Sequence, residues 1–143
     1  MKVIFTILIL VSSLTSFSPT DKIIGDYKRT FETTDNNKFE YQLTLSQDGT
    51  FSFHYYSKLI HGTPPEVNKY GKGRWTVENN VISFFTEKEK ELDEKYTLDF
   101  TNSKARFVTK SSRDKTDRIL DTKLVFLKSE IFWMEKIEMS KTL

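Results

Sequence analysis

The chain has 143 residues, no cysteine, and 22 Lys and Arg residues against 20 Asp and Glu residues. This length suits one domain with a single core and is short for two. The lack of cysteine excludes disulfides, thiolate metal ligands and a cysteine nucleophile. Basic and acidic residues are interspersed, whereas a nucleic-acid-binding protein gathers its basic residues on one face. We therefore expect one domain that does not bind nucleic acid.

The first 18 residues have the pattern of a secretory signal. Lys2 gives a charged start, residues 3–11 are mostly apolar, and small residues follow. The apolar run is shorter than the roughly 20 residues that a membrane-spanning helix requires. We expect residues 1–18 to be a signal peptide and residues 19–143 to be a single β domain without a membrane span. Export without disulfides favours a bacterial protein of the periplasm or the extracellular space.

The segment after the signal predicts a first strand over residues 22–31. Ile23, Tyr27 and Phe31 have the same parity and are expected on one face. Gly25 interrupts this parity, which suggests a bend or a close approach of another backbone.

Residues 39–55 predict a β-hairpin with one buried face. Apolar residues alternate with polar ones on both sides of Gln47-Asp48-Gly49, which fits a three-residue loop with glycine in the left-handed conformation. This loop predicts that the following residues lie opposite each other: Leu45 and Phe51, Leu43 and Phe53, Tyr41 and Tyr55.

Two further turns extend this hairpin into four strands. The turn from His61 to Glu66 contains two prolines, which cannot donate ladder hydrogen bonds, and Asn79-Asn80 suits a two-residue loop with positive φ. The proline turn predicts the pairs Phe53 and Trp75, Phe51 and Val77, Tyr55 and Gly73. The asparagine turn predicts the pairs Trp75 and Phe84, Val77 and Ile82. All three turns predict the same buried face.

The rest of the chain predicts more short strands. Residues 87–95 alternate in charge, which favours a solvated loop or one exposed helical turn over an electrostatic docking surface. A tight turn at Asn102-Ser103 predicts Phe100 opposite Ala105 and Leu98 opposite Phe107. Residues 111–117 form a polar loop. Residues 118–127, with Leu120, Thr122, Leu124 and Phe126 on one side, and residues 131–138 predict two last strands. Periodicity leaves open which of Phe132 and Trp133 points inward.

The number and spacing of these segments predict the fold class. About nine short strands with almost no helical pattern indicate an all-β protein. Sequential hairpins favour an antiparallel up-and-down barrel or half-barrel of about 8–9 strands, with little or no helix after the signal peptide.

Two motifs resemble the bacterial lipocalin-like family of small exported proteins. Gly25-Asp26-Tyr27 is similar to the Gly-x-Trp signature of lipocalins, with tyrosine in place of tryptophan. The run of residues 43–51, with Asp48-Gly49-Thr50-Phe51, followed by Gly73-Arg74-Trp75, resembles a hairpin and a later strand of that family. The resemblance covers residues 22–86 and implies an antiparallel barrel with an apolar cavity. It does not identify a ligand.

Residues with acid–base or metal-binding chemistry form no motif in this sequence. His54 and His61 are too far apart along one hairpin arm to chelate a single ion, so we expect no metal site and no cofactor. Glu40, His54 and Asp99 are candidates for acid–base chemistry, but nothing sets their pKa values apart. No Gly-x-Ser-x-Gly element is present. We therefore expect a protein that is not an enzyme.

Aromatic residues give the main indication of function. The rings expected to point inward either fill a core or line a cavity for a small hydrophobic or amphipathic ligand. In the second case, the predicted ligand-binding wall consists of Tyr41, Phe53, Tyr55, Trp75, Phe84 and Tyr96. The alternative is an envelope-associated protein-interaction or stress-related module with a filled core, which binds a protein at a sheet edge or at the hairpin tip from His61 to Glu66.

Overall fold

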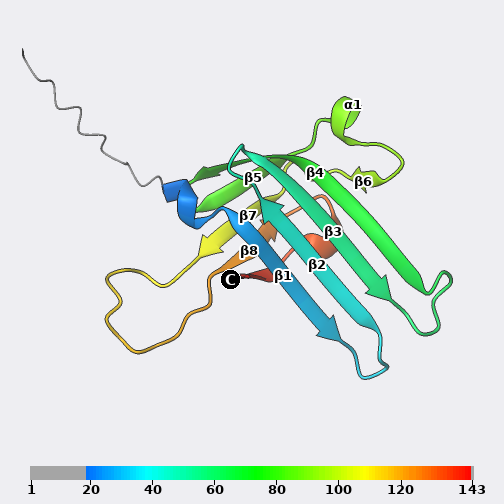
Figure 1. Ribbon diagram of the computed structural model, residues 1–143, viewed down its shortest axis with the longest axis horizontal. Helices are drawn as coiled ribbons and strands as arrows, with labels where there is room; N and C mark the ends of the chain where they lie inside the picture. The colour runs from blue at the N-terminus through cyan, green and yellow to red at the C-terminus, as the bar shows by residue number, and fades with distance from the viewer. Residues whose placement is uncertain (1–18, 143) are drawn as a thin grey trace, which may run out of the picture.

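The computed structural model describes residues 19–142, and they form a closed eight-stranded antiparallel β-barrel with one additional strand (Figure 1). The predicted signal peptide lies outside the described residues. In chain order the elements are two short 3-10 helices, one helical turn and nine strands: η1 (Pro19–Lys22), β1 (Gly25–Glu32), β2 (Lys38–Leu45), β3 (Thr50–Lys58), β4 (Glu66–Glu78), β5 (Val81–Phe85), α1 (Lys88–Glu91), β6 (Tyr96–Leu98), β7 (Lys104–Val108), β8 (Lys123–Lys128), η2 (Phe132–Met134) and β9 (Glu138–Lys141).

The barrel follows the predicted up-and-down order with one exception. Its strands lie in the order β3-β2-β1-β9-β8-β7-β5-β4, and pairing of β3 with β4 closes the ring. Strand β6 is the exception, because it pairs in parallel with β4 and lies outside this ring. The long strands β1 to β4 project beyond the shorter strands at one end, at the lower right of Figure 1. The two ends of the barrel therefore differ in shape.

The middle of the barrel is filled by aromatic rings. The Phe51 and Phe84 ring centroids lie 5.1 Å apart, and those of Phe53 and Phe100 lie 4.9 Å apart. Phe84 also stacks on Phe126 at 5.5 Å. Such offset and edge-to-face contacts stabilise a core beyond the burial of apolar area. The contacts join residues from β3, β5, β8 and the segment after β6 into one core.

The first and third predicted turns are confirmed in both register and conformation. Gly49 has a φ of 83°, and Asn79 and Asn80 have φ of 50° and 62°. The confirmed pairs are Leu45 and Phe51, Leu43 and Phe53, Tyr41 and Tyr55, Trp75 and Phe84, Val77 and Ile82.

The predicted register of the second hairpin is wrong by four residues. The structure pairs Phe53 with Gly71, Phe51 with Gly73 and Tyr55 with Lys69. The predicted pairs placed the turn centre at the prolines, but the strands pair as far as Lys58 and Glu66, and the carbonyl of Pro65 accepts a hydrogen bond from the Leu59 N–H. A proline that cannot donate still accepts, so it fits the return arm of the loop. Because the error is an even number of residues, every side chain keeps its predicted face.

The predicted hairpin around Asn102-Ser103 is also wrong. The turn exists, since the Ser103 N–H donates to the Phe100 carbonyl and Asn102 has a φ of 65°. It does not join two paired strands, because β6 pairs with β4 and β7 pairs with β5, where Ala105 lies opposite Ile82. The predicted partners Phe100 and Ala105, and Leu98 and Phe107, are therefore not strand partners. Phe100 enters the core instead and contacts the rings of β3 and β5.

The two predicted C-terminal strands are shorter than expected or displaced. Strand β8 begins at Lys123, so Leu120 lies in the preceding loop and is 40% exposed. Residues 131–138 are not a strand, because they contain η2, and β9 starts only at Glu138. A 3-10 turn distributes consecutive apolar residues around its axis, which explains why both parities of this run are apolar. Trp133 is half-buried against the core and Phe132 is 85% exposed.

The first strand begins at Gly25 rather than at residue 22. A buried tyrosine, Tyr27, links the strand to the residues that precede it. The Tyr27 hydroxyl donates a 2.5 Å hydrogen bond to the Ile23 carbonyl, and both residues are fully buried. Burial raises the pKa of the Tyr27 hydroxyl well above its usual value. The fold therefore favours the neutral phenol.

Gly73 lies where the barrel core has no room for a side chain. A Cβ atom there would overlap the Phe85 carbonyl oxygen and lie 2.9 Å from Cε1 of Phe51. We expect Gly73→Ala to lower the free energy of unfolding by about 3 kcal/mol, because a backbone carbonyl cannot move aside cheaply. Urea unfolding followed by tryptophan fluorescence measures this change. Ser52→Ala, on the exposed outer face, serves as control and changes the value by less than about 0.5 kcal/mol.

Tyr27 predicts a loss of stability at alkaline pH. An exposed tyrosine in the unfolded chain ionises at about pH 10, whereas Tyr27 in the fold stays protonated there, so stability falls as the pH rises above this value. Tyr27→Phe removes a hydrogen bond worth about 1 kcal/mol at neutral pH and weakens the alkaline dependence. Urea midpoints of both proteins between pH 7 and pH 11 provide the comparison. Parallel pH curves for the two proteins contradict this assignment.

Candidate functional site

The predicted wall residues lie mainly inside the barrel, and other rings contact Tyr41, Phe53, Tyr55 and Phe84 there. Tyr41, Phe53, Trp75 and Phe84 are buried, and Tyr55 is half-buried. The Tyr41 and Tyr55 centroids lie 5.2 Å apart, and the Trp75 indole N–H donates to the Ser46 carbonyl. These rings thus take part in a packed interior. Their role as a ligand-binding wall stays a prediction.

Tyr96 does not lie with the other predicted wall residues. It pairs with Tyr70 on β4, and its ring contacts the Tyr70 ring at 5.9 Å. Tyr70 stacks on His54, whose side chain points away from the barrel interior. The Lys72 ammonium lies 4.2 Å from the Tyr96 ring centroid. The sequence prediction assumed that β6 continues the barrel, and its parallel addition to β4 places Tyr96 on the outer face instead.

The three candidates for acid–base chemistry are engaged separately. Glu40 forms a 2.8 Å ion pair with Lys38, which holds the pKa of its carboxyl group below the usual value. Nε2 of His54 lies 2.8 Å from Oδ1 of Asn68. Asp99 accepts a hydrogen bond from the Thr101 N–H. Glu40 and His54 share the outer face of the sheet, and Asp99 lies on another segment after β6.

The projecting end of the barrel carries a cluster of five rings, four of them partly exposed, here called the aromatic end. Ring contacts of 4.8 to 6.3 Å connect these residues, which come from β1, β2, β3 and η2: Phe31, Phe39, Tyr41, Tyr55 and Trp133. Strand pairing places the four strand residues on the inner face. Phe31 is 37% exposed, and Phe39, Tyr55 and Trp133 are half-buried. The aromatic end thus presents apolar area that the fold leaves accessible.

Arg29 lies on the same inner face as these rings, next to Tyr41. Its Nη1 donates a 3.3 Å hydrogen bond to the Glu138 carbonyl, and its Cζ lies 5.5 Å from the Phe31 ring centroid. Its Nε is buried and has no hydrogen-bond partner, and no carboxylate within residues 19–142 forms an ion pair with it. Burial raises the pKa of the Tyr41 hydroxyl, while the Arg29 charge acts in the opposite direction. Arg29 is thus a half-buried cation without a counter-ion in the described chain.

Residues 19–142 lack two other kinds of functional feature. No group of three or more His, Cys, Asp or Glu side chains is arranged to hold a metal ion in this part of the chain. None of its helices has the length and apolar character needed to cross a bilayer.

Comparison of the chain with protein-family models, with curated proteins and with solved structures gave no significant match. The resemblance to lipocalin-like proteins therefore rests on the sequence motifs alone. The structure confirms the predicted all-β fold class and does not test the resemblance.

Sequence reasoning did not assign Phe31, Phe39, Trp133 or the neighbouring Arg29 to a site, although it placed Phe31 and Phe39 on the buried face of their strands. Arg29 has the parity of Tyr27 and Phe31 in the first strand, and this parity was a signal that its side chain faces inward. Trp133 gave no such signal, because it belongs to a 3-10 turn and reaches the rings of β2 and β3 only in the folded chain.

Trp133 and Phe132 offer a matched pair for testing the core of the aromatic end. Trp133→Ala removes contacts with Tyr41, Phe53 and Tyr55, and we expect it to lower the free energy of unfolding by about 3 kcal/mol. Phe132→Ala, at an 85% exposed ring, changes it by less than about 0.5 kcal/mol. Urea unfolding followed by far-UV circular dichroism compares both variants with the parent chain. Equal losses in the two variants contradict the placement of these rings.

Proposed function

We propose that this protein is a non-catalytic, lipocalin-like binding protein that holds a small amphipathic carboxylate at the aromatic end. The observation that carries the proposal is Arg29, a half-buried cation on an aromatic inner face with no carboxylate partner in the described chain. The proposed ligand packs its apolar part on the rings and accepts hydrogen bonds from the guanidinium group.

The exposure of the rings supports binding of the apolar part. Phe31 is 37% exposed and stacks on Phe39 at 4.8 Å, so these two rings are held in a fixed arrangement before a ligand arrives. Strands β1 to β4 project past the shorter strands (Figure 1), and Phe31 on β1 is exposed at this end. Burial of apolar area contributes about 25 cal/mol per Å², so an alkyl or aromatic group gains affinity by covering these rings.

The hydrogen-bonding capacity of Arg29 supports binding of the carboxylate. A guanidinium group has five N–H donors, and the described chain supplies one acceptor for them, the carbonyl of Glu138. A carboxylate accepts two parallel hydrogen bonds from such a group and neutralises its charge. Lys69, which pairs with Tyr55 and shares its face, adds a second positive charge near the opening. The charge of this end thus selects an anion over a neutral molecule.

The separate engagement of Glu40, His54 and Asp99 supports binding rather than catalysis, because an acid–base pair must share one site with a substrate. We further propose that the protein acts in the periplasm or outside the cell, on the basis of the signal pattern in residues 1–18.

A second candidate function is binding of a protein partner along the edge of β1. Within the described residues, β1 pairs with β9 at Tyr27 and Lys28 only. The Asp26 carbonyl accepts a hydrogen bond from the Thr142 N–H, so the backbone groups of Asp26 point toward β9. Backbone groups of every second residue in a strand point to the same neighbour, so those of Thr30 and Glu32 also point toward the β9 side. Strand β9 does not extend that far, and the described chain offers them no strand partner there. An unpaired edge accepts an extended segment of another protein. The filled core also favours this candidate, and the hairpin tip from His61 to Glu66 remains a second predicted contact.

A fluorescent fatty acid tests the proposed function. The probe is a dansyl-labelled undecanoic acid, and its methyl ester serves as the neutral counterpart. We expect saturable binding of the acid, and Arg29→Met weakens this binding about tenfold or more, because a hydrogen bond to a charged group contributes about 1.5 to 3 kcal/mol. Binding of the ester changes less than about twofold in the same variant.

Arg106→Met is the matched control, because Arg106 is exposed on β7 and lies away from the inner face. It leaves the affinity for both probes unchanged. The proposal fails when the parent chain takes up neither probe, or when Arg29→Met weakens acid and ester equally. Absence of uptake together with capture of an extended peptide at β1 supports the second candidate.

A further inference from the structure

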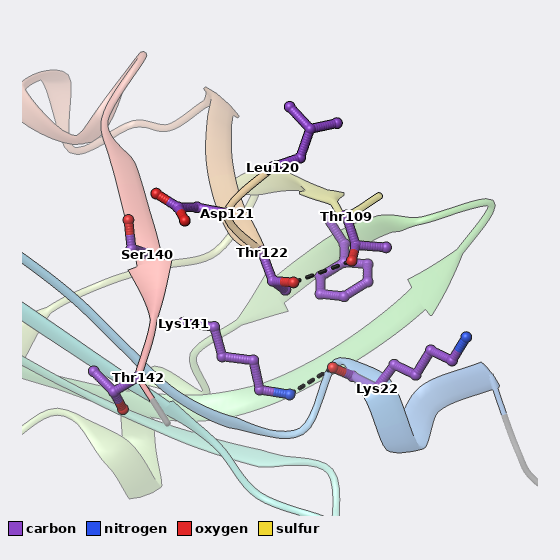
Figure 2. Close-up of a pocket in the computed structure, with 9 residues that line it drawn as sticks. Lys22, Thr109, Leu120, Asp121, Thr122, Ser140, Lys141 and Thr142 are labelled. Carbon is purple, nitrogen blue, oxygen red and sulfur yellow. Dashed lines mark hydrogen bonds between the residues drawn. The ribbon is translucent and has the colours of Figure 1, made fainter. Parts of the chain in front are cut away.

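The end of the barrel opposite the aromatic end contains a pocket of about 740 Å³ (Figure 2). It lies where β7 and β9 end and where β8 begins, beside the 3-10 helix that precedes β1. Its volume is within the range of about 300 to 1,000 Å³ that small-molecule sites occupy. We refer to it as the polar pocket.

Hydroxyl groups make up much of the polar pocket. The Thr109 and Thr122 hydroxyls lie 3.0 Å apart and share one hydrogen bond, and the Ser140 side chain lies on the neighbouring strand β9 (Figure 2). A hydroxyl both donates and accepts, so each threonine retains capacity for a further partner. Such groups suit a ligand that itself carries several hydroxyls.

Charged groups in the polar pocket are incompletely engaged. The Lys141 ammonium donates a 2.6 Å hydrogen bond to the Lys22 carbonyl, which leaves two of its three donors for other partners. Lys141 passes over Gly25, where a Cβ atom would lie 2.9 Å from Cε of the lysine. Within residues 19–142 the Asp121 carboxylate has neither a hydrogen-bond partner nor an ion-pair partner. The pocket therefore offers a cationic donor, Lys141, near the Thr109 and Thr122 hydroxyls, while the Asp121 side chain points to the Ser140 side (Figure 2).

Apolar area is also present in the polar pocket. Phe107, which is 7% exposed, and Leu120, which is 40% exposed, both line the pocket. A sugar ring combines polar hydroxyl edges with an apolar face of C–H groups, which matches this lining. The Lys22 side chain extends away from Lys141 (Figure 2), so the Lys141 ammonium supplies the positive charge that favours a negative ligand.

We propose that the polar pocket is a second binding site, and that its ligand is a saccharide bearing a carboxylate. The carboxylate accepts from the Lys141 ammonium, and the hydroxyls of the sugar pair with Thr109 and Thr122. This site lies at the other end of the barrel from Arg29, and it is independent of the function proposed above.

Nuclear magnetic resonance tests this proposal with three probes: glucuronate, glucose and acetate. Glucuronate carries both a carboxylate and sugar hydroxyls, glucose lacks the charged group, and acetate lacks the hydroxyls. We expect saturable shifts of the backbone amides of Thr109, Thr122 and Lys141 with glucuronate, and an affinity at least about tenfold lower for glucose and for acetate.

Two variants and a control identify the groups involved. Thr122→Val removes one hydroxyl with little change of shape and weakens glucuronate binding about fivefold, while Lys141→Met weakens it about tenfold. Thr30→Val, on the exposed outer face of β1, leaves the affinity unchanged. Amide spectra report the folding of each variant, and Thr122→Val tests the site even when Lys141→Met does not fold.

Three results overturn the proposal. The first is the absence of saturable shifts at the polar pocket with glucuronate. The second is binding of acetate or glucose as tightly as glucuronate, because one of the two features is then irrelevant. The third is an unchanged affinity for glucuronate in Thr122→Val. Arg29→Met leaves the polar pocket intact, so we expect this variant to bind glucuronate normally. The fatty-acid test and the glucuronate test can therefore fail independently of each other.

Discussion

The structure depends on a close contact between large rings and two glycines of β4. Phe51 lies opposite Gly73, and Phe100 covers Gly71, where a Cβ atom would meet its ring at 2.6 Å. This contact lets β4 come close to the interior while it pairs with both β3 and β5. Because an aromatic ring occupies the space that a side chain of β4 would take, the barrel closes around a filled centre.

Because the centre of the barrel is filled, the two candidate binding sites lie at its two ends. The aromatic end combines exposed rings with Arg29, whose charge has no counter-ion in the described chain. The polar pocket combines hydroxyls with Lys141 and Asp121. The two chemistries differ because the ends are built from different parts of the chain: long alternating strands form the first, whereas strand termini and a polar loop form the second. One barrel can in this way present two unlike surfaces.

Local turn chemistry made much of the fold predictable. Gly49, Asn79 and Asn80 adopt positive φ, and these conformations fix the registers that alternation alone leaves free. The proline turn misled the prediction, because its true centre near Gly62 depends on the Leu59 N–H and the Pro65 carbonyl. The face on which each side chain lies was still predicted correctly, since a register shift by an even number of residues leaves every side chain on the same face. Most inner-face residues of β2 to β5 were therefore predictable, including Phe53 and Trp75.

The sequence by itself determined the all-β class, the strand rhythm and the buried face, since these follow from periodicity and from turns of a few residues. Only the tertiary structure decided the placement of Tyr96, Phe100 and Trp133. Each lies outside a regular hairpin, and its position depends on contacts with distant strands: Tyr96 on Tyr70, Phe100 on Phe53, and Trp133 on Tyr41. Such long-range contacts leave no periodic pattern, because they depend on how the closed barrel brings separate segments together.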